Sequence, residues 1–153
     1  MLSIIRRADK DYLHEILDEV TAYLERHHCS GDFIFETQLI VEELFTNTCY
    51  YAYLGDEPEQ NCEFRLTFEE TELKIQRIDS GYAFNPLTLT KPDTESGFQE
   101  RKVGGLGMYL VSHYCSRMLY ERIKDKNVLT LYRSLAPRKK KPHTQPEEKT
   151  QAE

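Results

Sequence analysis

A carboxylate and a carboxamide lie four residues apart in the segment VEELFTN, at Glu43 and Asn47. In a helix this spacing places the two side chains one turn apart on one face, about 6 Å from each other. The amide oxygen is a hard ligand suited to Mg²⁺, and the carboxylate can accept a proton from an attacking hydroxyl group or orient it. An ordinary surface pair has the same spacing. The neighbouring Glu42 points about 100° away around the helix and is not expected to share the face of Asn47.

A second candidate acid, Asp79, ends an apolar strand in the segment RIDSGYAFNP and is followed by Gly81. An acid and a glycine after a strand are common in simple turns, and this interpretation stays open. The functional alternative is an adenine pocket. In such a pocket the carboxylate accepts a hydrogen bond from the exocyclic amine, Gly81 lets the base come close, and Tyr82 or Phe84 lines an apolar slot.

Three glycines fall within four residues at the start of a helix in the segment GGLGMYLV, Gly104 to Val111. Glycine costs backbone entropy there, which favours a function for bare backbone over mere close packing of the helix. The unpaired N–H groups of a helix start bind phosphate oxygens well. Arg101 and Lys102 precede the glycines and would add charge near a terminal phosphate. Neither of the two standard phosphate motifs, GxxxxGK[ST] and GxGxxGxV, occurs in the chain.

The hydrophobic pattern predicts the elements that position these three segments. Apolar residues recur with helical spacing over about 10–27 and 35–52, with Gly31 ending the first helix and Ser30 or Asp32 capping the second. An alternating pattern follows in 62–69 and 73–78, then a long loop over 81–103 that is typical of a lid. A helix starting at Gly104 and two strands, RMLYERI and NVLTLYR, separated by the turn KDKN, complete a two-layer α+β sandwich. Its sheet is mostly antiparallel, with the helices on one face.

Length and charge indicate one globular domain over residues 1–136 and a charged, disordered tail over 137–153. The net charge of -6 argues against a nucleic-acid partner, and no apolar run approaches the ~18 residues of a membrane span. The four cysteines are scattered, which indicates reduced thiols that serve as packing residues, and a cytoplasmic location is expected. The sequence His27-His28-Cys29 is not expected to bind metal, because adjacent helical residues point in different directions.

The order and spacing of the three segments resemble those of GHKL-type (Bergerat fold) ATPases. Within that superfamily the chain is similar to the bacterial anti-sigma-factor serine/threonine kinases, from about Ile34 to Arg133. The segment VEELFTNTCYYAY resembles the N-box and IDSGYAFNP the first glycine box. The segment KPDTESGFQERKVGGLGMYLV resembles the lid with the second glycine box, and NVLTLYR the closing strand.

This resemblance implies a kinase that binds ATP with Mg²⁺ and phosphorylates a serine or threonine of a STAS-type antagonist protein. It also implies that the unmodified antagonist and a sigma factor or other regulator compete for binding to the kinase. The kinase itself is expected to be a homodimer. Glu43 matches the catalytic base, Asn47 the magnesium ligand and Asp79 the adenine-binding acid. The remaining nucleotide-binding residues implied or expected nearby are Gly81, Phe84, Arg101, Lys102, Gly104, Gly105, Leu106, Gly107, Met108 and Thr130.

Three positions depart from the family pattern: Tyr51 replaces a histidine, Thr48 replaces a small residue after the N-box asparagine, and Asn85 replaces an aspartate before the first lid proline. None of them removes a core ATP ligand. Two alternatives to an active kinase therefore stay open. One is a binding module that holds ATP and a regulator without phosphotransfer. The other is the ATPase domain of a histidine-kinase-like phosphorelay, which is disfavoured because no helix with a phosphoacceptor histidine precedes the domain.

Overall fold

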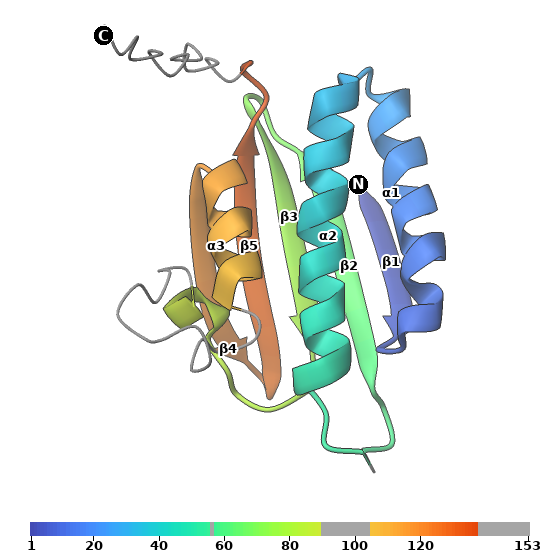
Figure 1. Ribbon diagram of the computed structural model, residues 1–153, viewed down its shortest axis with the longest axis vertical. Coiled ribbons are helices and arrows are strands. Elements are labelled where there is room, and N and C mark those ends of the chain that lie inside the picture. The colour runs from blue at the N-terminus through green and yellow to red at the C-terminus, as the bar shows by residue number, and fades with distance from the viewer. Residues whose placement is uncertain (56, 90–104, 138–153) are drawn as a thin grey trace, which may run out of the picture.

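The computed structural model describes residues 1–55, 57–89 and 105–137. Within these ranges the strands form one antiparallel sheet in the order β1 (Leu2–Arg7), β2 (Asn61–Phe68), β3 (Glu72–Asp79), β5 (Lys126–Ser134) and β4 (Arg117–Ile123). Figure 1 shows the helices α1 (Leu13–Arg26), α2 (Gly31–Tyr51) and α3 (Gly105–Tyr114) together on one face of the sheet. The predicted two-layer α+β architecture is confirmed.

The core lies between this sheet and the three helices. Alternation along β2 turns Cys62, Phe64 and Leu66 toward the helices, and the β2–β3 register places Leu66 opposite Ile75. Ile40, Val41, Leu44 and Phe45 of α2 are buried against this face. The apolar stripe of α2 therefore fixes which of its faces turns away from the core, and the polar residues at the edge of that stripe lie at the boundary with solvent.

Two boundaries differ from the sequence-based prediction. The first helix ends at Arg26, within one residue of the predicted end, but the residue that breaks it is His28 in the left-handed conformation (φ 58°) and not the predicted Gly31. Gly31 is instead the first residue of α2. Ser30 is the N-cap, as predicted, and its hydroxyl accepts a hydrogen bond from the Phe33 amide at 3.3 Å. The second helix therefore begins four residues before its apolar pattern becomes clear.

Strand β1 was not predicted from the pattern. Exposure alternates along this strand, with Ile4 buried, but the exposed Ile5 is also apolar, so the sequence LSIIRR does not reveal that alternation. Pairing of Ile4 opposite Phe64 makes β1 the edge strand beside β2. In addition, Lys10–Tyr12 forms a short 3₁₀ turn ahead of α1, so the α-helix begins three residues later than predicted.

Strand β5 is the last in the sequence but lies between β3 and β4 (Figure 1). It follows β4 through a tight turn in which Lys124 and Asp125 have positive φ angles, 46° and 62°, as two-residue hairpin turns require. The turn is thus shorter than the predicted KDKN, and Asn127 belongs to the strand. In the β3–β5 register, Asn127 lies directly opposite Asp79.

A buried arginine fastens the far end of β5 to the start of α2. The Arg133 side chain donates to the Phe33 carbonyl at 2.9 Å and to the Thr37 hydroxyl, and it forms an ion pair with Glu36. Helix α2 is therefore held against the last strand at one end.

The chain between β3 and α3 contains the predicted lid. Residues Pro86–Leu89 form a 3₁₀ turn, and 90–104 lie outside the described residues. The predicted tail also lies outside them from residue 138 onward. Among the helices that the structure describes, none has the length and apolar character needed to span a membrane.

Candidate functional site

Glu43 and Asn47 lie on one face of α2 and are hydrogen-bonded to each other. The Asn47 amide Nδ2 donates to Glu43 Oε1 at 3.1 Å, and both side chains are half-buried. Burial raises the pKa of the Glu43 carboxyl, while the hydrogen bond from Asn47 opposes that shift. Among the described residues, the Asn47 amide oxygen accepts no hydrogen bond. The pair therefore offers a carboxylate of raised basicity beside a free amide oxygen. Glu42, as expected, is exposed elsewhere on the helix.

The start of α3 lies directly against the Glu43 carboxylate. A Cβ atom built on Gly107 would overlap all three atoms of the carboxylate group. A side chain at this position would displace the Glu43 carboxylate, so glycine lets α3 lie this close to it. Gly105 is the first residue of α3, and Leu106 beside it is 75% exposed. The Met108 side chain is fully buried in the core. Arg101, Lys102 and Gly104 lie outside the described residues.

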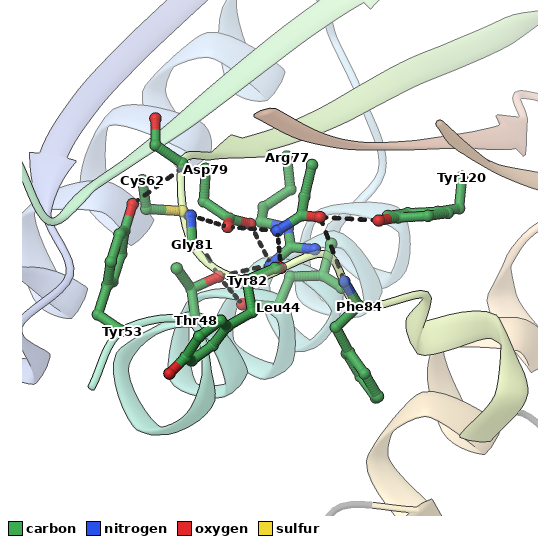
Figure 2. Close-up of polar contacts among 12 residues, drawn as sticks. Leu44, Thr48, Tyr53, Cys62, Arg77, Asp79, Gly81, Tyr82, Phe84 and Tyr120 are labelled. Carbon is green, nitrogen blue, oxygen red and sulfur yellow. Dashed lines mark hydrogen bonds and ion pairs between the residues drawn. The ribbon is translucent and has the colours of Figure 1, made fainter. Parts of the chain in front are cut away.

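Asp79 is the centre of a second cluster, which Figure 2 shows at the end of β3. Its side chain is fully buried. Oδ1 accepts hydrogen bonds from the Gly81 amide at 2.9 Å and from the Asn127 amide group at 2.8 Å. Oδ2 lies 2.8 Å from Arg77 Nη1 as an ion pair, but it receives no hydrogen bond from any described residue. One oxygen of this carboxylate is therefore fully engaged, and the other keeps accepting capacity.

Contacts between β3 and α2 bring the two clusters together. Arg77 donates from Nη1 to the Thr48 hydroxyl at 2.8 Å, and Thr48 is the residue after Asn47. Beyond the strand, a Cβ atom on Gly81 would overlap the backbone of Ala52, the C-cap residue of α2. Gly81 is therefore needed for close approach of the loop to the helix. The segments carrying Glu43, Asp79 and Gly107 thus converge on the same part of the molecule.

Asn127 is a member of this cluster that sequence reasoning missed. Its amide group also donates to the Tyr82 carbonyl at 2.6 Å, and its oxygen accepts from the Tyr120 hydroxyl at 2.8 Å and the Phe84 amide at 3.4 Å. It is 3% exposed. The sequence predicts Asn127 in the turn KDKN, where it would have no relation to Asp79. In the structure it is part of β5 and lies opposite Asp79.

Thr130, predicted to help bind adenine, is not brought to the cluster. It lies opposite Gln76, whose side chain donates to the Thr130 hydroxyl at 3.2 Å. Leu129 and Leu131 on either side of it belong to the core, so alternation turns Thr130 to the sheet face away from the helices. The residue of β5 that stands beside Asp79 is Asn127.

The aromatic residues after Gly81 are exposed. Tyr82 and Phe84 expose 46% and 51% of their surface, so neither ring is packed into a closed apolar slot by the described residues. Only their backbones are held, through Asn127 and through the hydrogen bond from the Tyr82 amide to the Ala52 carbonyl at 3.1 Å.

Comparison with known proteins bears on the family of this chain. The family model described as histidine kinase-like ATPase domain matches residues 7–133. The serine/threonine-protein kinase BtrW of Bordetella bronchiseptica is 26% identical over 114 residues, which cover 73% of this chain and 78% of that protein. The resemblance to GHKL-type ATPases is therefore confirmed.

Two solved structures share the fold. A chain of the SiaB–SiaC complex from Pseudomonas aeruginosa matches with a TM-score of 0.55 at 12% identity, covering 87% of this chain and 89% of that one. The histidine kinase domain of the blue-light-activated kinase EL346 from Erythrobacter litoralis matches with a TM-score of 0.51 at 13% identity. That match covers 82% of this chain but 60% of the kinase domain. At these identities the likeness concerns the fold alone.

Proposed function

Because the chain belongs to the family of histidine kinase-like ATPase domains, we propose that it is an ATP-dependent protein serine/threonine kinase and binding switch. Its substrate is a STAS-type antagonist protein, and it also binds a sigma factor or similar regulator. The observation that carries this proposal is the hydrogen-bonded pair of Glu43 and Asn47 beneath the start of α3. The name of the relative BtrW supports protein phosphorylation as the activity.

The residues present fit ATP and Mg²⁺. Asp79 Oδ2 is a buried acceptor without a hydrogen bond, which suits the exocyclic amine of adenine. The free oxygen of Asn47 suits Mg²⁺, a hard cation. The start of α3 presents backbone N–H groups at the positive end of the helix dipole, which suits phosphate. ATP, when bound, supplies the phosphoryl group.

Glu43 has the position and basicity of a general base. Its carboxylate would accept the proton of the serine or threonine hydroxyl, and the bond from Asn47 fixes which carboxylate oxygen is engaged on the helix. Phosphoryl transfer depends mainly on positioning and on neutralising charge, so a base, a metal ligand and a backbone cradle suffice.

The proposal is tested by incubating the purified chain with γ-labelled ATP, Mg²⁺ and the STAS protein encoded nearest to it. We expect label on the STAS protein, and none when its acceptor serine or threonine is replaced by alanine. Nucleotide-dependent binding of the STAS protein without any transfer would instead establish the non-catalytic switch. Transfer of label to a histidine would indicate a phosphorelay domain.

The pH dependence of transfer gives a further expected result. A general base acts in its ionised form, so transfer rises with pH as Glu43 loses its proton. Because burial raises the pKa of Glu43 above the ordinary value of 4.5, the midpoint of this rise is expected above that value. A pH profile of single-turnover transfer, compared with ATP binding over the same range, measures it. A midpoint at or below the ordinary value would argue that Glu43 is not the base.

A further inference from the structure

The strongest unexplained feature is a charged group on the core side of the sheet. Arg77 of β3 is 7% exposed and turns to the same face as the core residues Ile75 and Leu73. Burying an arginine is costly unless it is paired and hydrogen-bonded. Figure 2 shows its guanidinium between Asp79 and the backbone of α2.

The partners of Arg77 connect the two ends of the site. Nη1 lies 2.8 Å from both Asp79 Oδ2 and the Thr48 hydroxyl. Thr48 is fully buried, and its hydroxyl donates to the Leu44 carbonyl at 2.9 Å, so its oxygen is oriented to accept from Arg77. The chain of contacts thus runs from the turn of α2 that carries Asn47 to the acid at the end of β3.

The same contacts leave two buried atoms without a hydrogen bond, Asp79 Oδ2 and Arg77 Nε. Native proteins rarely leave such atoms unmatched, and an unmatched buried acceptor next to a site indicates a missing donor. Asn127 and the Gly81 amide already hold Oδ1. The donor that completes the carboxylate therefore approaches Oδ2.

We infer that Arg77 is a positioning residue for the nucleobase, held by Thr48, which fixes the Asp79 carboxylate so that Oδ2 accepts a hydrogen bond from a 6-amino purine. This inference rests on the proposed function, since it takes Asp79 to be the base-binding acid. It also gives Thr48, a departure from the small residue of the family pattern, a specific purpose. The Thr48 hydroxyl orients the arginine that orients the acid.

The test compares binding of ATP, inosine triphosphate and inorganic tripolyphosphate by calorimetry. Inosine triphosphate lacks the 6-amino group, and tripolyphosphate lacks the base. In the Thr48→Val variant we expect ATP affinity to fall about tenfold, the size expected from loss of a hydrogen bond to a charged group. The preference for ATP over inosine triphosphate is expected to fall by the same factor, with tripolyphosphate binding unchanged. Thr48→Ser, which keeps the hydroxyl, should restore both.

Thr37→Val is a matched control. Thr37 lies on the same helix, is equally buried, donates to the carbonyl four residues earlier and accepts from a buried arginine, Arg133. Loss of the Thr37 hydroxyl should lower the denaturation midpoint about as much as Thr48→Val does, and it should leave the preference for ATP over inosine triphosphate unchanged.

Three outcomes would overturn the inference. In the first, Thr48→Val keeps the ATP preference of the wild type. In the second, it loses affinity for all three compounds equally. In the third, Thr37→Val reduces the preference to the same extent. If the wild-type protein does not bind ATP at all, the proposed function fails together with the inference. If it binds ATP and Thr48→Val behaves as wild type, the inference fails alone.

Discussion

Replacing Glu43 with glutamine is expected to reduce phosphotransfer about 100-fold or more, the range found for loss of a general base. Glutamine has nearly the same shape and can still accept the hydrogen bond that Asn47 donates at 3.1 Å, so the local packing should persist. ATP affinity should change little, because Glu43 is assigned to the hydroxyl and not to the nucleotide. Single-turnover transfer and calorimetric ATP binding, measured on the same preparation, separate the two effects.

Glu42→Gln is the control for this substitution. Glu42 is the adjacent acid on the same helix, but it is exposed and lies on another face. It should transfer phosphate at the rate of the wild type. Full transfer by Glu43→Gln would exclude Glu43 as the base, and equal losses in both variants would indicate a general effect of charge on the helix.

The second large effect is expected from Gly107→Ala. The added Cβ would occupy the space of the Glu43 carboxylate, and that carboxylate is the flexible end of its side chain. It can turn away, which breaks its hydrogen bond with Asn47 but leaves the core intact. We therefore expect transfer to fall about 100-fold, as for loss of the base, with the circular dichroism spectrum retained. Gly107→Val should also abolish nucleotide binding, because its branched side chain extends further over the start of α3.

Gly31→Ala is the control for Gly107→Ala, because it also adds a methyl group at the start of a helix. A Cβ atom at Gly31 meets no atom within 4 Å, and the residue is the first of α2. This variant should retain both binding and transfer. Normal transfer by Gly107→Ala would mean that α3 does not press on Glu43 in the active protein, and loss of the folded spectrum would mean that Gly107 is needed for packing only.

The sequence predicted most of the fold because local patterns were clear where burial is one-sided. The alternation of Cys62, Phe64 and Leu66 was sufficient to place β2, and the spacing of Ile40, Leu44 and Glu43 was sufficient to orient α2. Strand β1 could not be found this way, since the exposed Ile5 is as apolar as the buried Ile4 and conceals the alternation. The end of α1 was predicted to within one residue, but its breaking residue was not, because His28 and not glycine adopts the left-handed conformation.

The candidate site was predicted less completely than the fold. Residues that act through their spacing in one segment, such as Glu43 with Asn47, were accessible from sequence. Asn127 was not, because its place opposite Asp79 depends on the register of β3 and β5. Arg77 shares a face with Asp79 by alternation along β3, but the sequence does not show that this charged pair is buried on the core side of the sheet. Thr130 and Asn127 are three positions apart on β5, so their side chains lie on opposite faces of the sheet and have different neighbours.

The central place of β5 constrains how the protein is made. Strands β1 to β3 leave the ribosome well before Lys126–Ser134, and β3 has only β2 as a neighbour in the sheet until β5 is present. Strand β4 precedes β5 by only the two turn residues and likewise has no neighbour before β5 forms. Likewise, Asp79 lacks its hydrogen bond from Asn127, and the first turns of α2 lack their contact with Arg133, until β5 is present. The contacts of Asp79 with Asn127, and of α2 with Arg133, therefore form only after β5 has been synthesised.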